Sequence, residues 1–211
     1  MFFLAFEGLD GSGKSSLISQ LQNYLILNHI NFIKTREPGG TQIGDQLRRI
    51  ILAKADEAPS ARTELLLYEA SRAQHVDLVI KPALQGKKWV LCDRFSASSV
   101  AFQAGGRQIS EEEVHWLNNF ATNSLKPHLN ILLDLSIEES QKRRQKRLLE
   151  VGGAEDRMES EVDSFHQRVR QSFLKQAKES PSQWLVLEAA NAPEALFQTL
   201  MHELKARKWL E

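Results

Sequence analysis

The segment 8–15 combines glycines, a lysine and a serine at a spacing suited to binding phosphate. It reads GLDGSGKS, a full match to the phosphate-binding loop pattern G-x-x-x-x-G-K-[ST]. Glycines let successive backbone N–H groups point at phosphate oxygens, and a helix that starts at the loop adds partial positive charge. The sequence therefore predicts that a nucleoside triphosphate binds here, with Lys14 at its terminal phosphates and Ser15 on magnesium. The expected contacts are Gly8, Leu9, Asp10, Gly11, Ser12, Gly13, Lys14 and Ser15.

Two pairs of charged residues each follow directly on a predicted strand. These pairs are Arg36-Glu37 after residues 31–35 and Asp93-Arg94 after residues 89–92. Open α/β sheets bind ligands outside the carboxyl ends of their strands, so both pairs should face the same side as the loop. Asp93 would orient magnesium or its water shell, and Arg94 would hold an anionic oxygen. The alternatives are a solvated charge pair at the first position and a structural ion pair at the second.

The elements that must position these residues alternate between strands and helices. The loop lies between an apolar run at 2–6 and a helical pattern of apolar residues from Leu17 to Leu25. Further strands are predicted at 31–35, 89–92, 130–135 and 184–187. Capping boxes at 110–113 and 136–139 predict two of the helix starts. We expect one α/β domain over residues 1–211, a five-stranded parallel sheet flanked by helices in three layers.

A helical pattern that starts near Pro59 and ends between Pro82 and Gly86 places an aromatic residue and an arginine on one face. Tyr68 and Arg72 are four residues apart, so a ring and a guanidinium could grip a planar base together. A core tyrosine beside a surface arginine is the alternative. A shorter amphipathic helix is predicted before this one from Ile43, Leu47, Ile50 and Ile51.

Residues 142–147 contain five cations, although the chain as a whole has no net charge. Gly152 and Gly153 follow them and break the helical pattern. A cationic segment hinged on glycines fits a short mobile lid, at about residues 142–158, that closes over phosphates. A solvated basic surface is the alternative.

The composition bounds the partners and the compartment. Acidic and basic residues number 27 each, so no overall charge favours nucleic acid or an anionic membrane. No apolar run approaches the length of a membrane span, and the N-terminal residues lack the features of a signal peptide. The single cysteine, Cys92, lies in a predicted strand and cannot form an intrachain disulfide. We expect a cytoplasmic protein without nucleic-acid or membrane partners.

The charged groups favour phosphoryl transfer over other uses of a phosphate-binding loop. The chain has no Asn-Lys-x-Asp, with which GTPases read guanine, and Asp93 is followed by arginine instead of the glutamate common in ATPase motors. A nucleoside monophosphate needs no strong general base, because its phosphate has a pKa of about 6 and is nucleophilic at neutral pH. The remaining task is to offset phosphate repulsion with arginines, lysine and magnesium. The predicted class is a nucleoside monophosphate kinase.

Five motifs resemble those of the bacterial thymidylate kinase family of P-loop nucleoside monophosphate kinases. They are EGLDGSGKSS at 7–16, TREPGGT at 35–41, YEASR at 68–72, DRF at 93–95 and AFQ at 101–103. The resemblance covers nearly the whole chain and implies a P-loop NTPase fold, a homodimer, and magnesium-dependent transfer of the γ-phosphoryl group of ATP to dTMP. A kinase for another monophosphate such as dUMP, or a non-catalytic ATP-dependent switch, is the alternative.

The resemblance also implies roles for single residues. Tyr68 takes the position of the aromatic that stacks on thymine, and Arg72 and Gln103 take those that hydrogen-bond its edge. Phe102 matches the ring that crowds out a 2′-hydroxyl. The set implied for dTMP is Asp10, Arg36, Glu37, Arg48, Tyr68, Arg72, Arg94, Ser99, Phe102 and Gln103. The implied catalytic set is Lys14, Asp10, Arg94 and the lid arginines Arg144, Arg147 and Arg157.

Two features depart from the family pattern. Many relatives carry tyrosine where this chain has Phe95 and Phe102, so hydrogen bonds from those hydroxyls are lost while the steric role of Phe102 is kept. Some relatives carry an arginine in the phosphate-binding loop where this chain has Gly11. The resemblance implies that the lid supplies this cation instead, with Arg144 or Arg147 favoured.

Overall fold

A computed structural model describes residues 1–152 and 154–210 of the chain. Its centre is a five-stranded parallel sheet, as the sequence predicted, and the strands follow the order β2-β3-β1-β4-β5. The strands are β1 (Phe3–Glu7), β2 (Phe32–Arg36), β3 (Trp89–Asp93), β4 (Leu129–Asp134) and β5 (Trp184–Glu188). Each bound lies within one residue of the run that predicted it. The inner strands β1, β3 and β4 are apolar almost throughout because helices cover both of their faces, whereas β2 at the edge is partly exposed.

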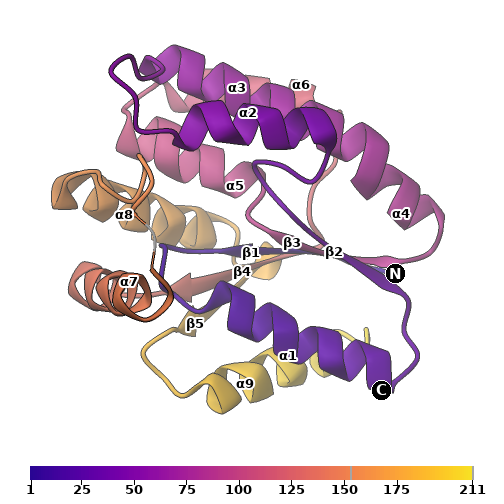
Figure 1. Cartoon of the computed structure of the whole chain (residues 1–211). Coiled ribbons are helices and arrows are strands. Elements are labelled where there is room, and N and C mark those ends of the chain that lie inside the picture. Colours follow the sequence, from indigo (N-terminus) through magenta and orange to yellow (C-terminus); the bar gives the residue numbers. More distant parts are fainter. Residues whose placement is uncertain (153, 211) are drawn as a thin grey trace.

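Helices form a layer on each face of the sheet (Figure 1). One layer contains α1 (Lys14–Leu27) and α9 (Pro193–Ala206), and the other contains α3 (Ala61–His75), α4 (Lys81–Gln85) and α8 (Asp163–Glu179). Side chains of β1 alternate between the two layers. Leu4 and Phe6 join the core under α1 and α9, while Phe3 and Ala5 pack on the opposite side.

The helix predicted from Pro59 does not end at Pro82, the first of the two positions expected to close it, because a π-helical turn joins α3 to α4. The turn spans Val76–Ile80, so Pro82 lies inside the helical run and Gly86 alone ends it. Proline has no N–H to donate, and the wider turn before it accommodates this gap in the hydrogen-bond ladder. A second π-helical segment, Val100–Gly106, follows the short α5 (Ser96–Ser99).

Two surface helices form as predicted but differ in detail. In α2 (Gln42–Leu52), Ile43 and Ile50 are exposed, so this part of the apolar pattern lies outside the core. α6 (Glu111–Thr122) begins after Ser110, whose hydroxyl makes no capping hydrogen bond. The capping box predicted at this start is therefore wrong, and the glutamates of the first turn favour the start through the helix dipole instead.

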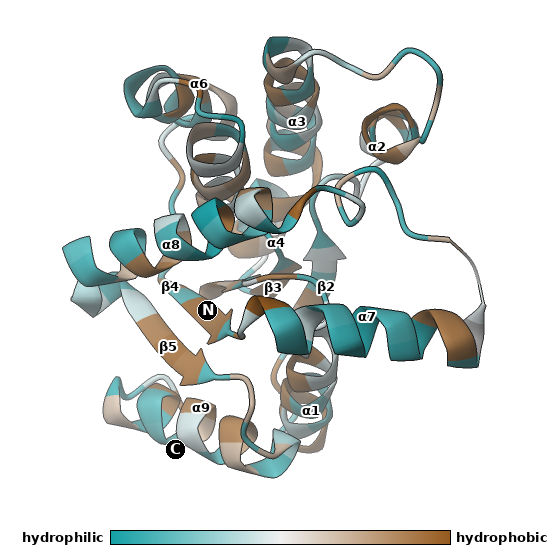
Figure 2. Ribbon diagram, turned by 90° about the vertical axis from the view of Figure 1, so that its left-hand side faces the viewer, coloured by the Kyte–Doolittle hydropathy of each residue, from teal (hydrophilic) through white to brown (hydrophobic). Residues whose placement is uncertain are grey.

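The basic segment forms the second half of α7 (Ile137–Val151), for which the predicted cap is confirmed. The Ser136 hydroxyl accepts a hydrogen bond from the Glu139 N–H. Figure 2 shows α7 as a mostly hydrophilic helix that crosses the side of the sheet on which the strands end. Gly152 ends the helix, and Gly153 lies outside the described residues. Up to residue 210, none of the described helices has the length and apolar content needed to cross a membrane.

Candidate active site

The phosphate-binding loop joins β1 to α1, and glycine is required at two of its positions. Gly8 has φ of 132°, and a Cβ atom there would lie 2.5 Å from the Leu133 carbonyl oxygen. Gly13, the N-cap of α1, has φ of 95°. Side chains are disfavoured in both conformations, so only glycine lets the loop pass this close to β4 and open toward the helix start. The strand, loop and helix predicted around the motif are confirmed.

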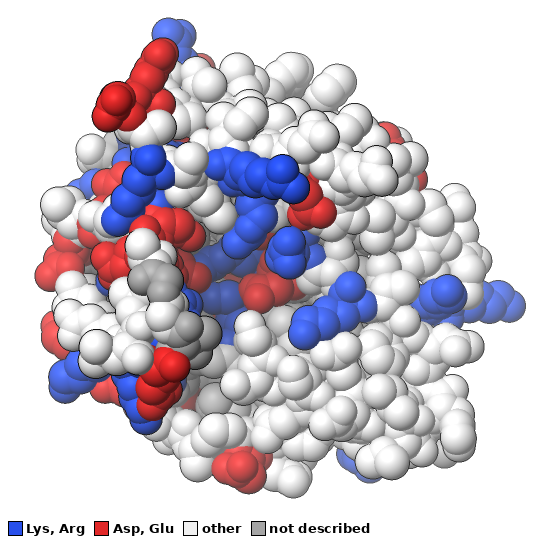
Figure 3. Space-filling model, viewed as in Figure 1, with Lys and Arg blue, Asp and Glu red and all other residues white. Residues whose placement is uncertain are grey.

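The loop borders a cavity of about 330 Å³, which we call the phosphate cavity. Lys14 lines it, and its Nζ donates to the carbonyl oxygens of Gly8 and Leu9 at 3.2 and 3.0 Å. Burial, and then the charge of Arg94, lower the pKa of Lys14. The walls also carry Asp10, Arg36, Arg143 and Arg147. Lysine and arginine side chains gather, together with acidic ones, around the hollowed part of the face in Figure 3.

Ser15 and Asp93 line the same cavity and fit the part predicted for them. They offer one hydroxyl and one carboxylate, and Mg²⁺ is commonly held by one or two protein oxygens together with substrate phosphates and water. The described residues contain no group of three or more His, Cys, Asp or Glu that could hold a metal ion. One hydroxyl and one carboxylate fit a magnesium ion that arrives with a nucleotide.

A narrower cavity of about 70 Å³ adjoins the first, and we call it the base cavity. Both cavities share the walls formed by Asp10, Glu37, Arg48 and Arg94. The structure brings every residue predicted for dTMP to the base cavity except Arg36, which lines the phosphate cavity and pairs with Asp45 at 3.3 Å. Lining residues that the sequence did not indicate are Pro38, Leu52, Ser98, Asp156 and Met158.

Asp10 and Arg94 form the wall at which the two cavities meet. Arg94 Nη2 donates to Asp10 Oδ1 at 2.9 Å, and Nη1 donates to the Gly8 carbonyl oxygen at 2.8 Å. The guanidinium carbon lies 5.0 Å from the centre of the Phe102 ring. Arg94 has φ of 68°, a left-handed conformation that is uncommon outside glycine and concentrates at functional sites. Burial alone would raise the pKa of Asp10, but the charges of Arg94 and Lys14 hold it well below its usual range.

Glu7 connects β1 to the segment after β3. Its Oε1 accepts a hydrogen bond from the Phe95 N–H at 2.8 Å, and the Ser98 hydroxyl donates to its Oε2 at 2.5 Å. Burial raises the pKa of Glu7 to about 7, against the opposing effects of the Ser98 hydrogen bond and the Arg94 charge. This carboxyl therefore changes charge near neutral pH, directly beneath the loop.

We expect Glu7 to make the protein less stable as the pH rises from 4.5 to about 7. The folded state holds the Glu7 proton through this window, whereas the unfolded chain releases it near pH 4.5. Because the folded state binds more protons, the Glu7 contribution to the free energy of unfolding is largest below the window and falls by about 3 kcal/mol across it. Urea unfolding across the window should show a flatter profile for Glu7→Gln, and the profile of Glu57→Gln, at an exposed carboxylate, should match the native one. An equal slope in Glu7→Gln would contradict this assignment.

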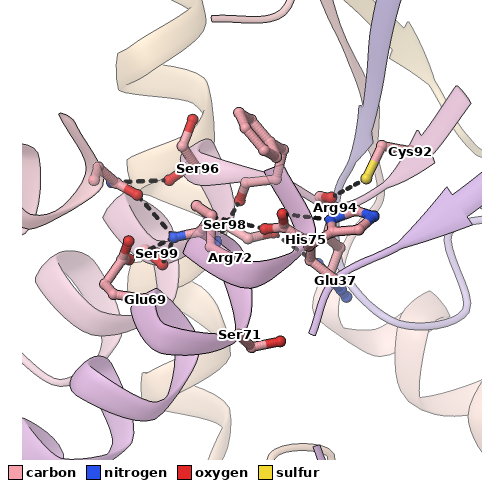
Figure 4. A network of polar contacts seen from close by, with 12 residues as sticks. Glu37, Glu69, Ser71, Arg72, His75, Cys92, Arg94, Ser96, Ser98 and Ser99 are labelled. Atoms are coloured by element: carbon pink, nitrogen blue, oxygen red, sulfur yellow. Dashed lines mark hydrogen bonds and ion pairs between the residues drawn. The ribbon is translucent and has the colours of Figure 1, made fainter. Parts of the chain in front are cut away.

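Arg72 lies in the wall of the base cavity at the centre of a buried polar network (Figure 4). Its acceptors are Glu37, Glu69, Ser99, Asn118 and the carbonyl oxygen of Phe95. Nη2 carries two N–H groups but meets only the Phe95 oxygen, at 3.2 Å, among the described residues. One N–H of Arg72 thus has no acceptor in this part of the chain. The alternative of a surface arginine is wrong, since Arg72 is 1% exposed and shares the cavity with Tyr68, as their spacing predicted.

The three predicted lid arginines take different positions. Arg147 lines the phosphate cavity together with Arg143, one helical turn earlier, which the sequence had not singled out. Arg144 projects from another side of α7, where its Nε lies 3.9 Å from Glu155, and it lines neither cavity. Arg157 also lines neither, because its Nε donates to the Ile51 carbonyl oxygen at 2.9 Å. Of the three predicted lid arginines, Arg147 therefore lines the phosphate cavity and Arg144 and Arg157 do not.

Gly11 lies directly under α7. A Cβ atom at Gly11 would be 3.1 Å from the Ser140 carbonyl oxygen and 3.2 Å from Arg143 Cβ. Any side chain at this position would push Ser140 and Arg143 of α7 by a few tenths of an ångström and would strain the backbone, whose φ is 79°. Glycine lets α7 pack on the loop without either cost. A cation from α7 is thus compatible with glycine in the loop.

The phosphate-binding loop follows the central strand of a parallel sheet, and the phosphate cavity beside it meets the base cavity at Arg94. This arrangement is that of a P-loop phosphotransferase. The family model described as Thymidylate kinase matches residues 6–200. The chain belongs to the thymidylate kinase family. The chain is 60% identical to the thymidylate kinase of Bdellovibrio bacteriovorus over 210 residues, which covers 100% of this chain and 98% of that relative.

Other thymidylate kinases match along most of their length as well. The protein from Geotalea daltonii is 44% identical over 188 residues, covering 88% of each chain. The protein from Sulfurihydrogenibium is 40% identical over 206 residues, covering 98% of each chain.

Proposed function

We propose that the protein transfers the γ-phosphoryl group of ATP to dTMP and releases dTDP and ADP. The observation that carries this proposal is the meeting of the phosphate cavity and the base cavity at Asp10 and Arg94. The phosphates of ATP would lie on the loop, and the base of the second nucleotide would fill the base cavity. The phosphate of that nucleotide would then meet the ATP phosphates at this wall. Membership of the thymidylate kinase family supports the same pair of substrates.

The polar groups of the base cavity complement thymine. Arg72 has an N–H to donate, and the Gln103 amide can accept through its oxygen because its nitrogen already donates to Glu64. Thymine carries an acceptor, O4, beside the donor N3–H, so Arg72 would meet O4 and Gln103 would meet N3–H. Cytosine reverses this pattern with a donor at N4. Tyr68 would stack on the base, and Phe102 would exclude a 2′-hydroxyl.

The chemistry would depend on charge, since the acceptor phosphate is nucleophilic without a general base. Lys14 and Arg147 would hold the donor phosphates, and Arg94 would hold the acceptor phosphate. Asp10 would keep Arg94 oriented, because its low pKa leaves it ionised and unsuited to carrying a proton. Magnesium held by Ser15 and Asp93 would add positive charge at the phosphates when bound.

The test is release of ADP from ATP and Mg²⁺ with dTMP, dUMP, dCMP, dGMP or AMP supplied separately. The strongest stimulation by dTMP would support both the reaction and the base-reading residues. Stronger stimulation by another monophosphate would keep the kinase but overturn the roles of Tyr68, Arg72 and Gln103. No stimulation by any of them would overturn the kinase in favour of an ATP-dependent switch.

We also propose that the protein is a homodimer that associates through α2, α3 and α6. Ile50, Leu66, Trp116 and Phe120 lie on these three helices, and each is more than half exposed. The helices are neighbours, since α3 contacts both α2 and α6, and the Trp116 and Phe120 rings stack with centres 6.0 Å apart. Exposed apolar side chains gathered on neighbouring helices in this way are typical of a protein interface.

Replacing both Trp116 and Phe120 by glutamate is expected to yield a monomer. Association would place two unpaired charges in a desolvated interface, which is strongly unfavourable. Size-exclusion chromatography with light scattering measures the mass directly. Leu27→Glu, which adds a charge at an exposed apolar residue of α1, should leave the dimer intact. A native protein with the mass of one chain would contradict the homodimer.

A further inference from the structure

Glu64 contacts a wall residue of the base cavity without lining the cavity itself. It lies in the first turn of α3 and is 0% exposed. Gln103 Nε2 donates to its Oε1 at 2.9 Å, and Arg107 donates to the same carboxylate through Nε at 3.1 Å and Nη2 at 2.9 Å. Arg157 Nη2 lies 2.7 Å from Oε2. A carboxylate paired with two guanidinium groups offers acceptors only.

The contact with Glu64 determines how the Gln103 amide is turned. An amide has one donating and one accepting end, and the end that meets a carboxylate must be the donor. Gln103 is 1% exposed, and its Oε1 meets no donor from residues 1–152 or 154–210. Since Gln103 lines the base cavity, the carbonyl oxygen is the end that it can offer to a base.

We propose that Glu64 is a positioning residue that sets the base specificity of Gln103. This inference rests on the proposed function, in which Gln103 reads N3 of the base. With the amide held by Glu64, the Gln103 oxygen accepts a hydrogen bond from the N3–H of thymine or uracil. Cytosine has no proton on N3, so there the oxygen would meet a second acceptor and no hydrogen bond would form. A neutral amide at position 64 could donate as well as accept, and Gln103 would then be free to turn its NH₂ group toward cytosine.

A simple structural role for Glu64 makes a different prediction. The same carboxylate holds Arg157, whose neighbours Asp156 and Met158 line the base cavity. If Glu64 only anchored this wall, its loss would weaken binding of all pyrimidine nucleotides alike. A change in the ratio between two nucleotides that differ in hydrogen-bond polarity separates the two roles.

The test measures kcat/KM for dTMP and dCMP in Glu64→Gln. We expect the dTMP:dCMP ratio to fall about tenfold, the order of one lost hydrogen bond, with an unchanged KM for ATP. Arg107→Met is the matched control, because it removes an ion pair from the same carboxylate but keeps the Gln103 contact. It should lower the urea midpoint and leave the ratio unchanged. If Glu64→Gln folds poorly, combining it with Arg107→Met restores the balance of buried charge and allows the same measurement.

A double-mutant cycle with Gln103→Met completes the test. Once the amide is gone, Glu64→Gln should no longer change the ratio. Equal losses for dTMP and dCMP in Glu64→Gln, or an effect that persists in the Gln103→Met background, would overturn the inference. Loss of the dTMP preference in Gln103→Met but not in Glu64→Gln would overturn this inference alone. An intact preference in Gln103→Met would overturn the base-reading role in the proposed function as well.

Discussion

Replacing Lys14 by methionine is expected to lower kcat for dTMP-dependent ADP release about a thousandfold, the upper range for losing one buried transition-state donor. Methionine keeps most of the length and apolar contact of the side chain, so the loss is mainly that of the charge. Lys14 is buried at the start of α1, where the negative charges of Asp93 and Asp10 act on it and little water screens them. Steady-state ADP release at saturating ATP and dTMP measures the effect.

Lys88→Met is the matched control for Lys14→Met. Lys88 is exposed before β3 and lines neither cavity, so its loss should leave kcat unchanged. Near-native turnover in Lys14→Met would mean that the loop does not act on the transferred phosphoryl group. It would also remove the main argument that the phosphate cavity is the reaction site.

The sheet was predictable because its signals are local. Runs such as Val90–Cys92 are apolar at every position, and only a strand covered on both faces needs such a run. The phosphate-binding loop was predictable for a similar reason, since the backbone of Gly8 and Gly13 requires glycine at fixed positions in the chain. The cytoplasmic location, the lack of nucleic-acid partners and the mobility of the lid rest on composition and pattern alone and stay predictions.

The π-helical turns could not be predicted from periodicity. Val76–Ile80 continues the helical pattern of apolar residues, so nothing in the spacing distinguishes five residues in a π turn from five in an α-helix. The sequence predicts a helix end at Pro82 because proline cannot donate to the regular hydrogen-bond ladder, but the π-helical turn before it accommodates the missing hydrogen bond. The rule that proline ends a helix therefore fails here, because the backbone before Pro82 is already in a π-helical conformation.

The base cavity shows where reasoning from spacing reaches its limit. Tyr68 and Arg72 share a helix, so their common face followed from a separation of four. Two of the partners that hold Arg72 are Glu37, directly after β2, and Asn118 on α6. No sequence spacing connects either of them to α3. Asp156 and the arginine after it were assigned to the lid together, and only the path of the chain shows which of them lines the cavity.

Which lid arginines line the phosphate cavity could not be predicted for a related reason. The composition of residues 142–147 indicates a cationic helix but not its rotation about its own axis. A helix turns by about 100° per residue, so Arg143 and Arg147 lie about 40° apart around the axis, and Arg144 lies about 60° beyond Arg147. Arg143 and Arg147 line the phosphate cavity, whereas Arg144 lies 3.9 Å from Glu155. The rotation depends on the packing of α7 over Gly11, a contact that could not be anticipated from the pattern of charges.

Arg94→Lys is expected to lower kcat/KM for dTMP about a hundredfold, even though the charge is kept. A guanidinium can donate to the Gly8 carbonyl oxygen and to Asp10 at once while it rests on Phe102, and an ammonium cannot reproduce this planar arrangement. Arg168→Lys is the control, because Arg168 also donates to a backbone carbonyl oxygen, that of Gly106, but lines neither cavity. Equal activity of the two lysine variants would contradict the role of Arg94.

The neutral variant Arg94→Met separates the position of Arg94 from its effect on Asp10. Burial raises the pKa of Asp10, and the positive charge of Arg94 is the strongest of the effects that lower it. Removing that charge therefore raises the pKa, so Asp10 takes up a proton at a higher pH than in the native protein. If Asp10 must be ionised for turnover, the acid limb of the pH profile of kcat/KM moves upward in Arg94→Met and stays in place in Arg94→Lys. An acid limb that is the same in both variants would show that ionised Asp10 is needed only to orient Arg94, and that turnover does not otherwise depend on its charge.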